Sequence, residues 1–61
     1  MPLKELLNQN GIKQKWLAKN VGVSETTVSS WCNGKSKPRQ YHIKRISSLL
    51  KVTQTTVQAN L

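Results

Sequence analysis

The chain has little cysteine, little acid and no phenylalanine: one Cys and two acidic residues stand among 61, and no Phe is present. Because a disulfide needs two cysteines, Cys32 alone excludes an internal disulfide and favours a reducing compartment. Cys32 and His42 together also lack a zinc-binding spacing. We therefore expect no metal ion and no cofactor.

Large apolar side chains are also few. The only aromatic residues are Trp16, Trp31 and Tyr41, and 36% of the chain is hydrophobic. A chain of this length buries only about 60% of the surface that its unfolded form exposes, which allows one modest core and no deep ligand pocket. We expect a single domain over residues 1–61, no small-molecule ligand and no enzymatic activity, because no acid-base or nucleophilic grouping is present either.

Long apolar runs are absent as well. The start, Met1–Glu5, leads into a mixed polar stretch, and no segment approaches the roughly 20 apolar residues of a membrane-spanning helix. No signal peptide is recognisable. We expect a cytoplasmic protein with no membrane partner.

Positive charge is what the chain has in excess. Ten Lys and Arg residues stand against Glu5 and Glu25, which gives a net charge of +8. A surface of mixed sign would serve solubility equally well, so this excess favours a polyanionic partner. A nucleic acid is the main candidate and is preferred to an anionic membrane surface.

The apolar residues recur at helical spacing along the whole chain. No segment alternates with period two, so we predict no strand and an all-α bundle of five helices. Gly11, Gly22 and Gly34 are suited to end helices, and Ser24 and Thr53 are suited to cap them. The predicted helices are Pro2–Asn10, Gln14–Asn20, Glu25 to near Asn33, Gln40–Lys51, and a last one from Thr53 to Leu61.

Residues 14–33 form the most informative segment, with two short predicted helices joined by a turn at Gly22. Ala18 is small where the two helices must approach closely, and apolar residues on both helices interlock beneath the turn. These apolar residues are Leu17, Val21, Val23, Val28 and Trp31. Such a unit presents its second helix outward.

This segment resembles the phage-repressor (Cro-like, XRE-type) helix-turn-helix family of DNA-binding regulators. The resemblance runs from about Leu3 through Val57, and Gly11-Ile12, Gln14 and Asn33-Gly34-Lys35 followed by Pro38 belong to it. It implies a lambda-repressor-like DNA-binding domain that binds double-stranded DNA and is associated with the nucleoid in the cytoplasm. The implied function is sequence-specific transcriptional regulation, with repression from a palindromic operator as the leading role.

Two positions depart from the family pattern. Lys13 and Arg39 stand where the family commonly has a small hydroxyl residue that caps the second and the fourth helix. We expect these two helix ends to be less well capped. Their basic side chains either contact phosphate or reflect simple surface variation.

The second helix of such a motif enters the major groove with its N-terminal residues near the base edges. We predict base contacts from its outward positions, with Glu25 accepting a hydrogen bond from cytosine. The predicted base-contacting residues are Glu25, Thr26, Ser29 and Ser30. The alternative reading is that Glu25 is only a favourable charge at a helix N-terminus and that the hydroxyls form a solvated face.

Because this helix carries no positive charge, affinity must come from the residues that flank it. The predicted contacts to the DNA backbone are Lys13, Gln14, Lys15, Thr27, Asn33, Lys35, Lys37 and Arg39. The resemblance implies that Gln14 contacts a phosphate or an adjacent base and that Arg39 reaches the minor groove. It also implies that Asn33 and Lys35 clamp the DNA backbone. Other basic residues, Lys4, Lys44, Arg45 and Lys51, are expected to be solvated surface.

Trp16 stands where the motif usually has a polar residue, and we expect it to be partly exposed. Packing against the first helix is the preferred explanation, and a protein-binding patch is the alternative. Since one small module contacts few base pairs, we expect a weak homodimer that is completed on DNA, formed through the fourth and fifth helices without a dedicated dimerisation domain after Leu61.

Three other functions remain open at this point. The chain could be an antitoxin or a control protein of a mobile element, which adds a protein partner. It could be a protein-interaction adaptor that kept the fold and lost the DNA, although its basic flanks argue against this. A nonspecific RNA-binding or chromosome-coating protein would be expected to show stacking aromatics or a long basic arm, and neither is present.

Overall fold

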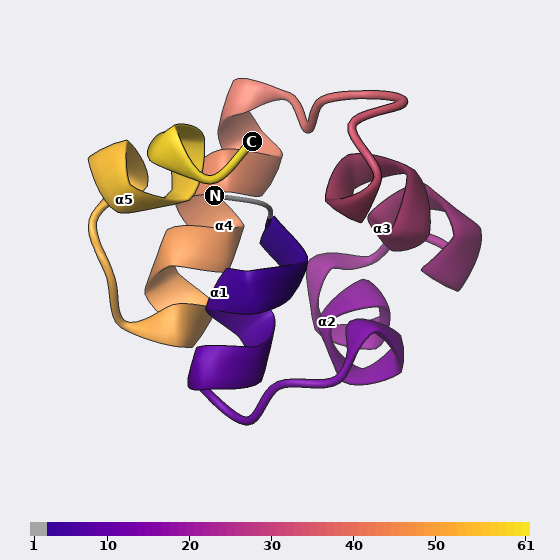
Figure 1. Cartoon of the computed structure of the whole chain (residues 1–61), viewed down its shortest axis with the longest axis horizontal. Helices are drawn as coiled ribbons and strands as arrows, with labels where there is room; N and C mark the ends of the chain where they lie inside the picture. Colours follow the sequence, from indigo (N-terminus) through magenta and orange to yellow (C-terminus); the bar gives the residue numbers. More distant parts are fainter. Residues whose placement is uncertain (1–2) are drawn as a thin grey trace.

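The computed structural model describes residues 3–61, and all regular structure in this range is helical (Figure 1). The helices are α1 (Leu3–Gln9), α2 (Gln14–Val21), α3 (Glu25–Cys32), α4 (Gln40–Leu50) and α5 (Gln54–Ala59). The predicted all-α class and the five helices are confirmed, with ends that differ by at most two residues. The expected helix start at Pro2 lies outside the described residues.

The predicted helix caps are present. Ser24 and Thr53 have extended backbones, and their hydroxyls accept hydrogen bonds at 3.1 Å from the N–H groups of Thr27 and Thr56. Gly22 ends α2 in the left-handed region with φ of 90°, a conformation that a glycine adopts without steric cost. Local sequence chemistry therefore sets where α2 ends and where α3 and α5 begin.

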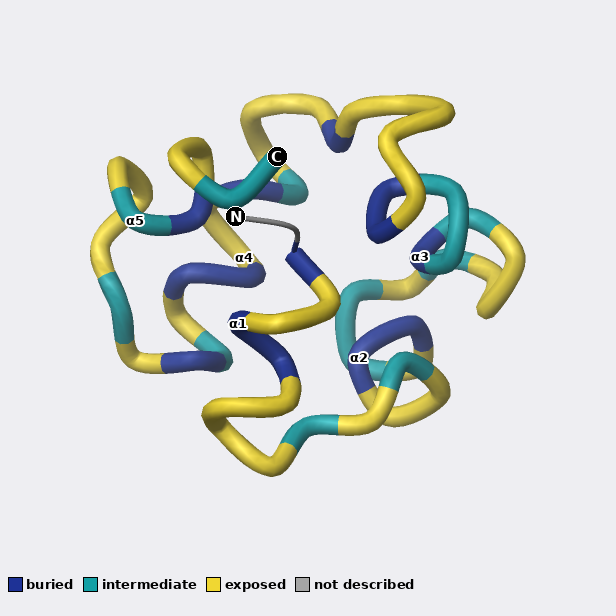
Figure 2. The backbone as a smooth tube through the Cα atoms, viewed as in Figure 1, coloured by how far each residue is buried: buried dark blue, intermediate teal, exposed yellow. Residues whose placement is uncertain are grey.

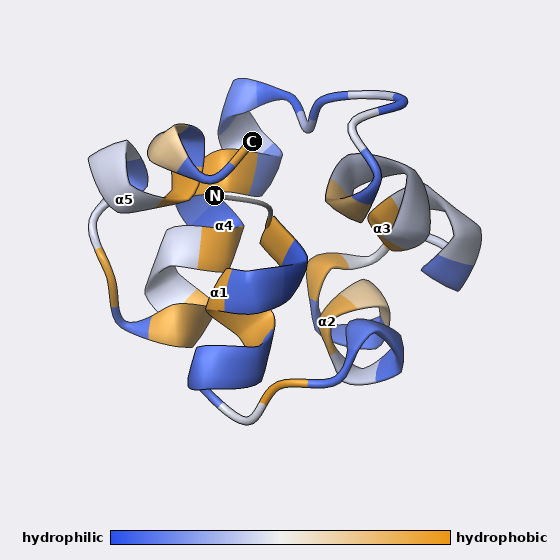
Figure 3. Ribbon diagram, viewed as in Figure 1, coloured by the Kyte–Doolittle hydropathy of each residue, from blue (hydrophilic) through white to orange (hydrophobic). Residues whose placement is uncertain are grey.

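One core joins all five helices. On α1, α3 and α4 the buried residues are spaced three and four apart, which gives each of these helices one inward face. Figure 2 shows the buried segments of all the helices, and Figure 3 shows their hydrophobic faces. The buried apolar residues are Leu3, Leu6, Leu7, Leu17, Ala18, Val28, Trp31, Cys32, Ile43, Ile46, Leu50 and Val57.

The helices are grouped in two pairs. Figure 1 shows α2 and α3 on one side, α4 and α5 on the other, and α1 between them. Polar bonds reinforce the packing: Arg45 Nε donates to the carbonyl of Asn20 at 3.3 Å, and Gln40 Nε2 donates to Gln54 Oε1 at 2.6 Å. This arrangement backs α3 with the core and leaves its outer face uncovered.

Candidate nucleic-acid interface

The turn between α2 and α3 orients the second helix. The N–H groups of Gly22 and Val23 both donate to the carbonyl of Ala18, at 2.9 and 3.0 Å. Val21 and Val23 pack partly buried against the core. Because this turn is closed by hydrogen bonds and by packing, α3 leaves it in a defined direction.

The residues of α3 divide into an inner and an outer face. Val28 is fully buried and Trp31 is 4% exposed, whereas Glu25 and Thr26 are exposed. Ser29 and Ser30 are half-buried. The predicted inward positions are therefore confirmed, and the first turn of α3 is the part most accessible to a partner.

Three of the four predicted base-contacting residues line one shallow groove. Glu25, Thr26 and Ser29 form it together with Gln14 of α2, and it holds about 320 Å³. Ser30 does not line this groove, and its carbonyl accepts a hydrogen bond from the N–H of Lys35 at 2.9 Å. Ser30 therefore lies nearer the loop that follows α3.

Thr27 has a structural role that the sequence analysis did not assign. Its hydroxyl lies 2.8 Å from Ser24 Oγ, and its N–H donates to the same oxygen. The hydroxyl is thus engaged in the cap of α3. The predicted contact of Thr27 with the DNA backbone stays a prediction.

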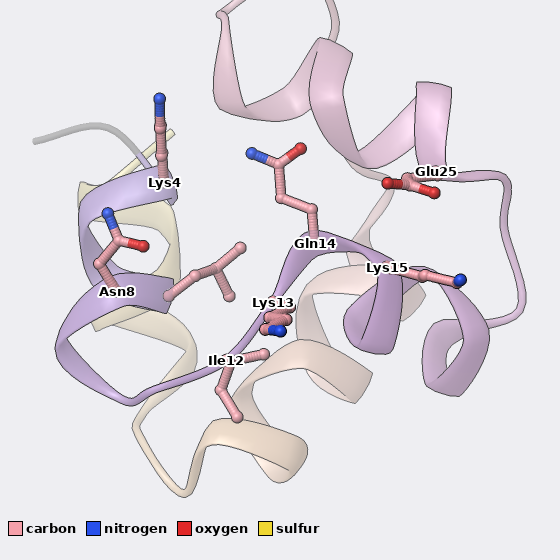
Figure 4. A pocket seen from close by; sticks show the side chains of 8 residues that line it. Lys4, Asn8, Ile12, Lys13, Gln14, Lys15 and Glu25 are labelled. Carbon is pink, nitrogen blue, oxygen red and sulfur yellow. The ribbon is translucent and has the colours of Figure 1, made fainter.

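A second groove lies between α1 and the start of α2 and holds about 470 Å³. It brings together three predicted backbone-contacting residues, Lys13, Gln14 and Lys15, and it shares Gln14 and Glu25 with the first groove. Figure 4 shows its side chains. The full lining is Lys4, Leu7, Asn8, Ile12, Lys13, Gln14, Lys15 and Glu25.

Two residues of this groove were missed by the sequence analysis. Lys4 was expected to be plain solvated surface, and Asn8 was not considered; both line the groove from α1. Lys4 is exposed, as expected, but it is not remote from the candidate interface. Their spacing of one helical turn puts them on one face of α1. Only the tertiary structure shows that this face lines a groove with the start of α2.

The other predicted backbone contacts lie beyond the C-terminal end of α3. Asn33, Lys35, Lys37 and Arg39 are all exposed, and the loop that carries them runs from α3 to α4 (Figure 1). Asn33 Nδ2 donates to Ser29 Oγ at 3.4 Å, which ties the start of this loop to α3. Basic side chains therefore flank α3 at both of its ends.

The expected weak helix caps are confirmed. Lys13 and Arg39 occupy the N-cap positions of α2 and α4 with extended backbones, and neither side chain accepts a hydrogen bond from its helix. The first-turn N–H groups of α2 therefore gain no side-chain partner from Lys13.

Two aromatic side chains are exposed. Trp16 is 43% exposed, which confirms the expected partial exposure, while its packing against α1 stays a prediction. Tyr41 is 66% exposed and was not singled out from the sequence. Its ring lies against that of His42 at a centroid distance of 4.1 Å.

Cys32 is buried at the C-terminal end of α3. Burial raises the pKa of its thiol, and the positive charge of Lys4 opposes this rise in part. Among residues 3–61, no three His, Cys, Asp or Glu side chains are grouped so that they could hold a metal ion. No helix in the described part of the chain is both long and apolar enough to cross a membrane.

Comparison with known proteins bears on this arrangement. A family model described as helix-turn-helix matches residues 3–55. No curated protein matches the chain. A solved structure of a transcriptional regulator from Listeria innocua is similar, with a TM-score of 0.82 and 22% sequence identity over 90% of this chain. This chain spans 51% of that protein's length, and at this identity the likeness shows the fold.

The match of the family model covers α2, the turn and α3, as well as α1, α4 and the start of α5. It therefore includes both grooves and the basic loop after α3. The chain belongs to the XRE-type helix-turn-helix DNA-binding family.

Proposed function

We propose that this chain is the DNA-reading domain of a transcriptional repressor, and that α3 reads a palindromic operator in the major groove. One observation carries the proposal: the exposed polar first turn of α3 is backed by buried Val28 and Trp31, with lysines at both ends of the helix. A helix held in this way can enter a groove while the lysines meet the phosphates on either side.

The two kinds of contact have different tasks. Lys13, Lys15 and the cations of the loop after α3 supply affinity that is independent of sequence and sensitive to salt. Glu25 supplies specificity, because a carboxylate only accepts hydrogen bonds and so pairs with the amino group of cytosine. Thr26 and Ser29 add weaker discrimination. Repression then needs no catalytic step, since an occupied operator excludes other proteins.

The dimer that we propose forms mainly on DNA. Half-sites on a palindrome lie about 34 Å apart, centre to centre. The longest extent of the domain is 24 Å, so two copies at that spacing meet only along narrow edges. Such small contacts support a weak association in solution, with α4 and α5 as the proposed contact region.

The proposal is tested by selecting bound sites from a random DNA library and titrating the best duplex against a scrambled one at several salt concentrations. We expect a palindromic site and a clear preference over scrambled DNA. Glu25→Ala and Thr26→Ala should reduce that preference, whereas Glu5→Ala and Thr55→Ala, which remove the same groups from exposed positions elsewhere, should not.

Two results would contradict the proposal. Equal, salt-sensitive binding to every duplex would indicate a nonspecific binder. No binding to any duplex would favour the adaptor function. Sedimentation without DNA tests the dimer separately, because a tight dimer at micromolar concentration would contradict assembly on the operator.

A further inference from the structure

The α1 side of the second groove carries two hydrogen-bond donors that lie outside the helix-turn-helix unit formed by α2, the turn and α3. Lys4 and Asn8 lie one helical turn apart, so their side chains leave α1 on the same face, and both line the groove. Lys4 also lies close enough to α3 for its charge to act on the Cys32 thiol. The first helix therefore presents its donors toward α2 and α3.

The start of α2 forms the opposite wall. Figure 4 shows the amide of Gln14 between Lys4 on one side and Glu25 on the other. Lysine ammonium groups and side-chain amides donate hydrogen bonds, and the lining holds three lysines against one carboxylate. The groove is thus an open site with an excess of donors and positive charge, which suits an anion.

We infer that this groove holds a backbone phosphate of the bound DNA, and that Lys4 and Asn8 are two of its contacts. The inference rests on the proposed DNA-binding function and extends the interface from the helix-turn-helix unit to α1. Lys4 supplies a charge to the phosphate, and Asn8 supplies an amide N–H.

Continuity between the two grooves identifies the anion as DNA. Gln14 and Glu25 line both the groove beside α1 and the groove along α3. A strand whose base edges meet Glu25 and Thr26 carries its backbone out of the major groove on either flank. Because the two grooves share Gln14 and Glu25, we place the next stretch of this backbone, on the α2 flank, along the groove that Lys4 and Asn8 line.

The test pairs protein variants with modified DNA. The selected duplex is made with a neutral methylphosphonate at one backbone position at a time, and the wild type, Lys4→Gln and Lys44→Gln are titrated with each duplex. Lys44 is the matched control, because it is an exposed lysine on α4 that lines neither groove.

At one position flanking the half-site, we expect the modification to weaken wild-type binding about tenfold. Lys4→Gln should bind the unmodified duplex about tenfold more weakly than the wild type does. The methylphosphonate at that position should then reduce the affinity of Lys4→Gln little further. The salt slope of Lys4→Gln should fall by about one, and that of Lys44→Gln should not change. Asn8→Ala should bind the unmodified duplex more weakly than the wild type and should lose little further affinity when the same position is modified. Its salt slope should not change, because the amide of Asn8 is neutral.

The possible failures are distinguishable. If Lys4→Gln and Asn8→Ala are as sensitive as the wild type to every methylphosphonate, α1 does not contact the backbone and the inference is overturned, while operator binding by the wild type stands. If the wild type binds no duplex, both the proposed function and this inference are overturned.

Discussion

The indole of Trp31 lies against the imidazole of His42, with ring centroids 5.2 Å apart and planes inclined by 45°. Trp31 is the last large inward residue of α3, and His42 lies in the first turn of α4. The exposed ring of Tyr41 also lies against the imidazole of His42, with ring centroids 4.1 Å apart. α3 is therefore held against α4 by an aromatic contact as well as by the packing of the shared core.

His42→Ala should lower the free energy of unfolding by about 1 kcal/mol or more, because an aromatic pair contributes about 0.5–1.5 kcal/mol beyond the area that it buries. Tyr41→Ala removes one exposed ring and one of the two ring contacts of His42, and it should lower stability by less than His42→Ala, which removes both. Urea unfolding followed by circular dichroism measures both. Equal effects of the two substitutions would show that the ring of His42 has no special role.

Lys13→Ser should change stability and DNA affinity in opposite directions. Lys13 is the N-cap of α2 with φ of −86° and ψ of 147°, a backbone on which serine can accept the free N–H groups of the first turn. We expect a gain of about 1 kcal/mol in stability. At the same time, loss of a phosphate contact should weaken operator binding and lower its salt slope by about one.

Lys13→Ala is the control for this pair of effects, since it removes the charge without adding a cap. It should weaken binding as Lys13→Ser does and bring no gain in stability. Thermal melting and a salt titration of operator binding separate the two properties. Unchanged binding by both variants would show that Lys13 is ordinary surface.

Local chemistry explains how much of the fold could be predicted. The ends of α2 and α3 follow from Gly22 and Ser24, whose roles depend only on neighbouring residues, and the inward face of α3 follows from helical spacing. That Lys4 and Gln14 line one groove depends on how α1 packs against the rest of the bundle, α3 in particular. The spacing of residues along the sequence does not reveal how two helices are placed, so the contribution of Lys4 and Asn8 to the groove could not be predicted.

The same reasoning applies to side chains that serve two purposes. Thr27 fits the pattern of an outward polar residue, yet its hydroxyl lies within hydrogen-bond distance of Ser24. No sequence pattern indicated a packing role for His42, because its contact with Trp31 joins two helices that a loop separates. Spacing alone predicts which face a residue occupies, but not which neighbour engages it.

The Cys32 thiol should make stability depend on pH in the alkaline range. Burial raises its folded-state pKa, so the folded protein keeps a proton that the unfolded chain loses. The stability that the protonated Cys32 thiol contributes is fully present below the pKa of an unfolded thiol, about 8.5. It is lost as the pH rises through the raised pKa of the folded state. Comparing the wild type with Cys32→Ala isolates the contribution of this thiol from that of the rest of the protein.

The difference in unfolding free energy between the wild type and Cys32→Ala should therefore narrow as pH rises from about 7.5 to about 9.5. Urea unfolding with a reductant present, at a series of pH values, measures this difference. A difference that stays constant over that range would show that the thiol titrates alike in the folded and unfolded chains.

Glu25→Gln should change which base the protein prefers, because glutamine both donates and accepts hydrogen bonds. Glutamine pairs with N6 and N7 of adenine, whereas a carboxylate accepts from the amino group of cytosine. We expect site selection to replace cytosine by adenine at one position of each half-site, with a discrimination of about 1–3 kcal/mol between the two duplexes. Glu5→Gln, which neutralises the other carboxylate, should select the wild-type sequence. If Glu25→Gln also selects the wild-type sequence, Glu25 acts only as a favourable charge at the N-terminus of α3, and specificity must reside in Thr26, Ser29 and the shape of the DNA.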